Sequence, residues 1–143
     1  REGHRRALST LPDPLERWFA GRGWRPRRHQ LEMLEAARSG DHALLVAATG
    51  AGKTLSGFLP TLADLIERPT GRLHTLYVSP LKALAVDVQR NLLAPIAEMG
   101  IDIRVETRSG DTPSDRKARQ RLRPPQILLT TPESLSLLLS YED

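Results

Sequence analysis

The stretch from His42 to Thr54, which reads HALLVAATGAGKT, decides the fold. Its first half, His42 to Ala47, is a short apolar run of the kind that forms a buried strand in a parallel sheet. Its second half, Ala47 to Thr54, satisfies the P-loop pattern with alanine at the first position. A buried strand that runs into a small-residue turn and then into a helix is the setting that a P-loop needs. The stretch therefore predicts an α/β domain that binds a nucleotide.

The residue types of this loop are those that hold a polyphosphate. Small side chains allow backbone N–H groups to wrap a β-phosphate, and the following helix adds the positive end of its dipole. Lys53 is expected to reach the β- and γ-phosphates and the Thr54 hydroxyl to ligand Mg²⁺, which makes them the candidate catalytic pair. An incidental Lys-Thr pair in a small-residue turn is the alternative, and the surrounding strand and helix argue against it. The expected cofactors are ATP and Mg²⁺, and the expected phosphate-binding residues are Ala48, Thr49, Gly50, Ala51, Gly52, Lys53 and Thr54.

Hydrophobic periodicity along the chain alternates between helical and strand-like segments, which predicts a parallel sheet built from βαβ units and flanked by helices. The expected strands are 42–47, 73–79, 101–107 and 126–130. The expected helices are 13–20, 26–39, 53–68, 81–99, 112–123 and 132–140, with breaks or kinks at Pro60 and Pro95 and glycine ends at Gly40 and Gly100. Two regions are expected: N-terminal helices over 1–40 and the nucleotide-binding domain over 41–143.

Composition sets limits on the class of protein. At 143 residues with 39% hydrophobic content, the chain is expected to form one globular domain with its own core. It has no apolar run long enough to span a membrane, so no membrane partner is expected. It has no cysteine, which excludes disulfide scaffolds and thiolate metal sites and fits a cytoplasmic location. A net charge of +4 is compatible with a nucleic-acid partner.

Gln30, in the segment from Trp24 to Gln30, is the candidate for reading a base. A glutamine amide can pair bidentately with N6 and N7 of adenine. Taken alone, it is more simply an exposed helix residue, but its place just ahead of a P-loop strand favours adenine recognition. Trp18, Phe19 and Trp24 are either a stacking face for the base or ordinary core residues, and the sequence leaves that choice open.

Ser-Pro or Thr-Pro pairs follow three of the expected strands, at Ser79-Pro80, Thr112-Pro113 and Thr131-Pro132. In each pair the hydroxyl residue is a natural N-cap and the proline a natural first helical residue, so good helix capping is one interpretation. In a parallel sheet, however, these helix N-termini gather at the edge that also carries the P-loop. A row of helix N-termini suits a phosphate backbone, and Lys82 and Arg108 are expected to add charge there.

The expected helix over 112–123 is very basic and has almost no apolar face. It fits a solvated surface helix, a direct contact with phosphates, or a contact with a second domain.

The motifs, in this order, resemble those of the superfamily 2 DExH helicases, and in particular the Lhr-like group with its ligase-associated branch linked to the DNA damage response. The resemblance covers about residues 15–140. It assigns an adenine-reading Q motif to 24–30, motif I to 47–54, motif Ia to 77–87, motif Ib to 108–113 and the following motif to 130–135.

This resemblance implies an ATP-dependent 3′-to-5′ translocase on single-stranded or partly duplex DNA, with a role in DNA repair. It implies a RecA-like fold, with ATP held between this domain and a second RecA-like domain of the parent chain. The implied nucleic-acid-binding residues are Ser79, Pro80, Lys82, Arg108, Gly110, Asp111, Thr131, Pro132 and Glu133. The Asp-Glu-x-His motif II of the family is expected soon after residue 143. The sequence is therefore expected to be either the N-terminal fragment of a longer enzyme or a truncated reading frame, inactive alone and with apolar surface exposed.

Three rival hypotheses separate by their response to nucleic acid. A motor hydrolyses ATP faster on DNA, whereas a small-molecule P-loop enzyme is indifferent to it. A passive module binds nucleic acid in a salt-sensitive manner and ignores ATP. An RNA or RNA–DNA hybrid substrate is the alternative to DNA.

Overall fold

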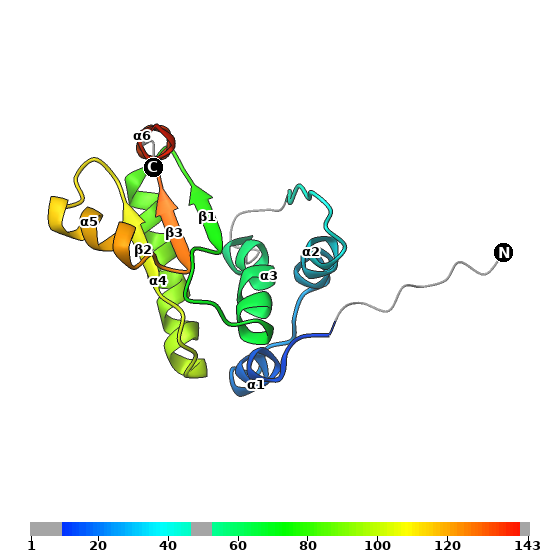
Figure 1. Ribbon diagram of the computed structural model, residues 1–143. Helices are drawn as coiled ribbons and strands as arrows, with labels where there is room; N and C mark the ends of the chain where they lie inside the picture. Colours follow the sequence, from blue (N-terminus) through cyan, green and yellow to red (C-terminus); the bar gives the residue numbers. More distant parts are fainter. Residues whose placement is uncertain (1–9, 47–52, 141–143) are drawn as a thin grey trace. The chain divides into compact units, whose positions relative to one another are not determined.

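The computed structural model describes residues 10–46 and 53–140, which fall into two compact units, with the boundary along the chain between Glu67 and Arg68 (Figure 1). The first unit is helical, and the second contains a parallel sheet. Among the described residues, no helix is long and apolar enough to cross a membrane.

The first unit is built from α1 (Asp13–Gly21), α2 (Arg28–Arg38) and α3 (Lys53–Glu67). Helix α2 packs against α3, and Leu34 of α2 is buried. Arg38, in the last turn of α2, ties the unit together. Its guanidinium donates to the Thr10 carbonyl oxygen at 2.7 Å and pairs with the Glu67 carboxylate at 2.7 Å. The α3 side chains buried in the structure are Ser56, Phe58, Leu59, Thr61, Leu62, Ala63 and Leu65.

The second unit is organised around three parallel strands in the order β1-β3-β2 (Figure 1). Their bounds are Thr75–Val78 for β1, Val105–Arg108 for β2 and Ile127–Thr130 for β3. Every residue of the central strand β3 is buried, as its unbroken apolar run predicts. The strands end level with one another, because Thr130 is the register partner of both Val78 and Arg108.

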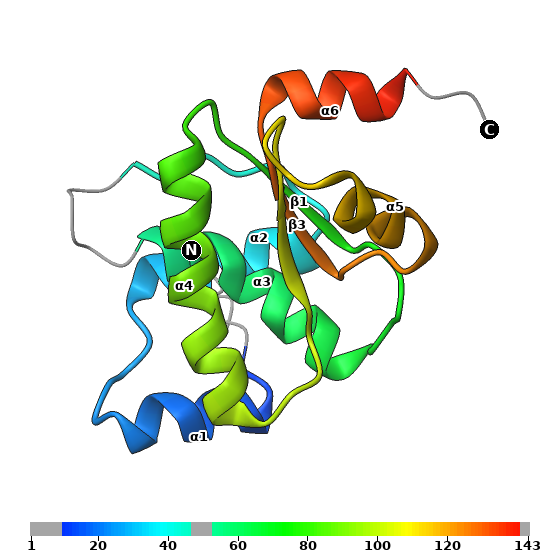
Figure 2. The same ribbon diagram turned by 90° about the vertical axis from the view of Figure 1, so that its left-hand side faces the viewer.

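Three helices alternate with these strands: α4 (Lys82–Met99), α5 (Ser114–Leu122) and α6 (Pro132–Leu139) (Figure 2). Helix α4 packs against β2 and β3, and its buried Ala85, Val88, Leu92 and Ile96 recur at helical spacing. Gly100 ends α4 in the left-handed conformation, with φ 66°, where a side chain would be strained. The alternating parallel α/β architecture predicted for this part of the chain is confirmed.

The strand predicted over 42–47 is not found in its described part. Residues 42–46 have no strand conformation, and the side chains of Leu44 and Val46 are 89% and 85% exposed. A strand is stabilised by hydrogen bonds to a neighbour, and residues 42–46 pair with none of the described strands. Ala47, the last residue of the predicted strand, lies outside the described residues.

Helix starts differ from the predicted ones in several places. Helix α1 already includes Asp13, and the predicted capping box with Glu16 is absent because the Pro12 carbonyl oxygen accepts from Glu16 instead. Helix α2 starts at Arg28, two residues after Pro26. Pro60 and Pro95 lie inside continuous helices, so neither breaks its helix, although each removes one backbone hydrogen bond and crowds the preceding turn.

The central strand should dominate the stability of the second unit. We expect Leu129→Ala, at a fully buried position of β3, to lower the free energy of unfolding by about 2–5 kcal/mol, because it leaves a cavity in the sheet core. Leu137→Ala, at an exposed position of α6, should change it by less than about 0.5 kcal/mol. Urea denaturation followed by circular dichroism measures both, and equal effects would contradict the central place of β3.

Candidate functional site

A cavity of about 470 Å³ opens in the first unit. This volume lies within the range of small-molecule pockets, roughly 300–1,000 Å³. Its walls come from the end of α1, the connection to α2, the first turn of α2 and the first turn of α3. The lining residues are Phe19, Gly23, Trp24, Arg25, Arg27, Gln30 and Leu55.

Gln30 lies in the wall of this cavity with its amide held in a fixed orientation. Its side chain is only 4% exposed, and its Oε1 accepts a hydrogen bond from the Arg27 backbone N–H at 2.8 Å. That bond caps the start of α2 and identifies which amide atom is the oxygen. An amide oxygen has a second lone pair, and the amide nitrogen carries two donors. The residue can therefore serve the helix and a base at the same time.

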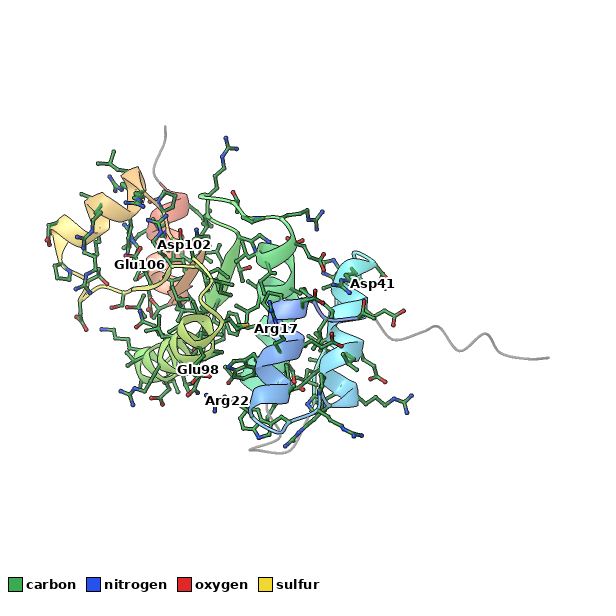
Figure 3. All side chains as sticks on the ribbon, turned by 90° about the horizontal axis from the view of Figure 1, so that it is seen from below. Arg17, Arg22, Asp41, Glu98, Asp102 and Glu106 are labelled. Atoms are coloured by element: carbon green, nitrogen blue, oxygen red, sulfur yellow. The ribbon has the colours of Figure 1, made fainter. Side chains whose placement is uncertain are left out.

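The aromatic residues form an edge-to-face cluster beside the same cavity. The Trp18 ring lies 5.2 Å from the Phe19 ring and 5.7 Å from the Trp24 ring, both nearly perpendicular. Arg22, at the end of α1 (Figure 3), places its guanidinium 5.0 Å from the Trp18 ring centre and 5.2 Å from that of Trp24. Phe19 is buried and Trp24 is 51% exposed, so Trp24 supplies an accessible ring face to the cavity wall.

The first turn of α3, which contains two of the predicted phosphate-binding residues, contributes Leu55 to the cavity wall. Lys53 is the first residue of α3 and is exposed, Thr54 follows it half-buried, and Leu55 lines the cavity. The first-turn N–H groups of a helix carry its positive dipole end. Among the residues of the first turn of α3, Leu55 lines the cavity with Gln30, and Lys53 and Thr54 directly precede it in the chain. Ala48, Thr49, Gly50, Ala51 and Gly52 lie outside the described residues.

In the second unit, the two hydroxyls predicted to lie on the nucleic-acid track are engaged in local structure. Ser79 is buried, continues the ladder through its N–H to the Thr130 carbonyl oxygen at 3.0 Å, and accepts from Leu81 N–H at 3.3 Å. Thr131 is buried, caps α6 and accepts from Ser134 N–H at 3.4 Å.

Only one of the three hydroxyl-proline pairs therefore caps as predicted, at Thr131 with Pro132 as the first helical residue. The N-caps of α4 and α5 are Leu81 and Pro113, because Ser79 and Thr112 form turns ahead of the helices. Four other predicted nucleic-acid-binding residues are exposed near the carboxyl ends of the strands. They are Pro80, Gly110, Pro132 and Glu133.

Arg108, at the carboxyl end of β2, is buried rather than exposed at the surface. Its side chain is 6% exposed, and Nη1 lies 3.5 Å from the Lys117 carbonyl oxygen, at the outer limit of a hydrogen bond. The expectation that Arg108 adds charge to the surface is not what the structure shows, because the last residue of β2 faces into the packing of α5.

Lys82 and Asp111 form an exposed ion pair that joins the start of α4 to the loop after β2. Lys82 Nζ lies 2.5 Å from Asp111 Oδ2. The hydrogen bond and the charge of Lys82 hold the pKa of Asp111 below its ordinary value, and the charge of Lys117 adds to the same effect. The Asp111 carboxylate is therefore ionised and engaged.

The basic helix α5 is held by polar contacts. Gln120 is its single buried residue, and Gln120 Nε2 donates to the Thr107 carbonyl oxygen at 3.1 Å. Gln120 Oε1 is buried without a hydrogen-bond partner. The predicted absence of an apolar face is confirmed, with Leu122 89% exposed.

Several site features were missed from the sequence. The sequence pattern does not predict that Leu55 and Arg25 line the cavity, because this depends on how α2 and α3 pack. The sequence could have predicted that Gln30 caps α2, because a glutamine at the third helical position is half of a capping box.

Comparison with known proteins gives consistent matches. A family model described as DEAD/DEAH box helicase matches residues 27–143. The Lhr helicase/uracil glycosylase of Escherichia coli is 40% identical, over 92% of this chain and 10% of its own length. The solved Mycobacterium smegmatis helicase Lhr, bound to ssDNA and AMP-PNP, is 40% identical with a TM-score of 0.84, over 94% of this chain and 18% of that one. The helicase MrfA, bound to DNA and AMPPNP, is 31% identical with a TM-score of 0.81, over 92% and 18%.

The chain thus spans 10% of the length of the first curated relatives that it matches. These structural matches also carry the RecA-like helicase fold, of which the three-stranded unit is a part.

The cap role of Gln30 can be separated from any ligand role by two substitutions. Gln30→Ala should lower the free energy of unfolding by about 0.5–2 kcal/mol, because the Arg27 N–H loses its acceptor. Gln30→Glu keeps that acceptor beside Arg25 and Arg27 and should retain most of the stability. Thermal and urea denaturation of both variants test this, and an alanine variant as stable as the parent would show that the cap contributes nothing.

Proposed function

Because this chain belongs to the DEAD/DEAH box helicase family, we propose that its protein couples ATP hydrolysis to movement along nucleic acid, with the first unit holding the nucleotide. One observation carries the proposal. The cavity that contains Gln30 also contains Leu55, the residue that directly follows Lys53 and Thr54 in α3. The proposed base-reading amide therefore lines the same cavity as a residue of the first turn of α3, which supports a nucleotide lying between them.

The nucleotide is proposed to bind with its adenine at Gln30 and its phosphates at the start of α3. The Gln30 amide donates to N7 through Nε2 and accepts from the N6 amino group through the lone pair that Arg27 leaves open. Trp24 offers a ring face to the base, and Arg22 holds that ring in place. GTP presents a carbonyl where ATP presents an amino group, so this wall favours ATP.

Lys53 and Thr54 are proposed to act on the phosphates and on Mg²⁺. The Lys53 ammonium neutralises charge on the β- and γ-phosphates, and the Thr54 hydroxyl is a hard oxygen ligand of the kind Mg²⁺ prefers. The bound Mg–ATP supplies the phosphoryl transfer that drives movement. Their position in the first turn of α3 adds the helix dipole to the same end.

The carboxyl edge of the second unit is proposed to carry the nucleic acid. Its strands end level, so the starts of α4 and α6 and the loop before α5 lie along one edge. Because the Ser79 and Thr131 hydroxyls are engaged, we expect the strand to contact backbone N–H groups, Lys82 and the exposed loop residues. The M. smegmatis Lhr structure contains ssDNA, and we propose single-stranded DNA as the strand here.

Further properties follow the family resemblance and belong to the same proposal. The protein moves 3′-to-5′, acts in DNA repair, and completes its ATP site with a second RecA-like domain of the parent chain. These properties concern whole helicases, and this chain spans 10% of the length of the first curated relatives.

The coupling is tested by ATP hydrolysis in the intact protein at low salt, with and without single-stranded DNA. We expect DNA to stimulate turnover strongly, and Lys53→Ala to lower the stimulated rate by about 10²–10³-fold, because a phosphate-neutralising charge is lost. Arg90→Ala, at an exposed position of α4, is the control and should keep the parental rate. Turnover that ignores DNA would move the protein to the non-motor P-loop enzymes.

Adenine recognition is tested by Gln30→Glu, which keeps the helix cap and removes the amide donors. We expect KM for ATP to rise by about tenfold while KM for GTP changes little, because only adenine uses this pairing. Steady-state hydrolysis of the two nucleotides measures the ratio. An unchanged preference for ATP would remove Gln30 from base recognition.

A further inference from the structure

Asp111 forms an ion pair with one lysine and feels the charge of a second, which comes from a different helix. Lys82 is the first residue of α4, and Lys117 is the fourth residue of α5. Lys82 Nζ contacts Asp111 Oδ2 at 2.5 Å, and Lys117 lies close enough for its charge to act on the same carboxylate. These are two of the three lysines in the chain, and the third is Lys53 of the P-loop.

The loop that carries Asp111 is held by its own hydrogen bonds. The Ser109 N–H donates to Thr112 Oγ1 at 3.0 Å, and the Asp111 N–H donates to Ser109 Oγ at 3.3 Å. The carboxylate is therefore presented to Lys82 by an ordered turn.

The ion pair is exchangeable, because both partners face solvent. The Lys82 and Asp111 side chains are 55% and 80% exposed, and exposed ion pairs contribute little to stability. The pair therefore does little to hold α4 and the loop together. A carboxylate and a phosphodiester are both oxyanions, so a phosphate can take the place of Asp111 at the lysines.

The charges in α5 point to an anionic partner as well. Arg116 and Lys117 lie in its N-terminal half, where positive charge opposes the helix dipole. Asp115 in the first turn offsets part of this charge, and a negatively charged ligand at this end of α5 would offset the rest.

We propose that Lys82 and Lys117 form a site for one backbone phosphate of a nucleic-acid strand, and that Asp111 occupies this site as an internal counter-ion until the strand displaces it. The proposal rests on the proposed function, since it refines where the strand binds. It gives Asp111 a role opposite to that of a direct contact: the carboxylate competes with the strand.

Competition between Asp111 and the strand predicts that removing the Asp111 charge strengthens DNA binding. The cluster carries two positive charges and one negative charge, and Asp111→Asn removes only the negative one. We expect this variant to bind single-stranded DNA about two- to fivefold tighter at low salt, the range that an exposed ion pair allows. We also expect a steeper loss of affinity with salt, because a larger net charge meets the phosphates.

The experiment measures binding of a fluorescent single-stranded oligonucleotide to the full-length protein by anisotropy, without nucleotide, between about 50 and 200 mM salt. Lys117→Gln should weaken binding, and adding it to Asp111→Asn should bring affinity back near the parental value. Lys82→Gln should abolish the gain from Asp111→Asn. Asp111→Glu, which keeps the charge, should bind like the parent.

The matched control is Asp102→Asn, the same substitution at an exposed aspartate ahead of β2, at the other end of that strand (Figure 3). A gain with Asp111→Asn and none with Asp102→Asn supports the proposal. Equal gains in both would reduce the effect to net charge and overturn it. Affinity that is unchanged or weaker in Asp111→Asn overturns it while leaving the proposed function intact, whereas a parent that binds no DNA at any salt overturns both.

Discussion

The register of β3 is the constraint on which the second unit depends. Thr130 lies opposite both Val78 and Arg108, so three parallel strands end at the same level. The Thr130 side chain reinforces that alignment by donating from Oγ1 to the Arg108 carbonyl oxygen at 2.8 Å. Because the strands end together, the segments that follow them emerge along one edge. A slip of one residue would put the strand ends at different levels and move these segments away from a common edge.

Gln30 has two roles in the first unit: it caps a helix and lines the cavity. One lone pair of its side-chain oxygen satisfies the Arg27 N–H at the start of α2, and the rest of the amide faces the cavity. The helix thereby fixes the rotamer before any ligand arrives, which lowers the entropy lost on binding. The same arrangement means that most substitutions here disturb the fold and the pocket together.

Much of the second unit follows from the sequence, because its signals are local. The apolar run of β3 and the glycine that ends α4 predict their structures within one or two residues. Pairing and burial are not local: residues 42–46 read as a strand but find no partner among those described, and Arg108 reads as a surface cation but is buried. The candidate site divides in the same way. Residue types predicted Gln30 and Lys53, while the cavity that contains Gln30 and Leu55 required the packing of α2 and α3.

The guanidinium of Arg22 lies close to both indole rings, which bears on their fluorescence. The chain has two tryptophans, and both belong to the cluster around that cation, with Trp24 in the cavity wall. Indole emission responds to nearby charge and to stacked aromatic rings. A purine bound in the cavity as proposed would change the surroundings of Trp24 directly and those of Trp18 through the shared cation. Intrinsic fluorescence would then follow occupancy of the pocket without any added label.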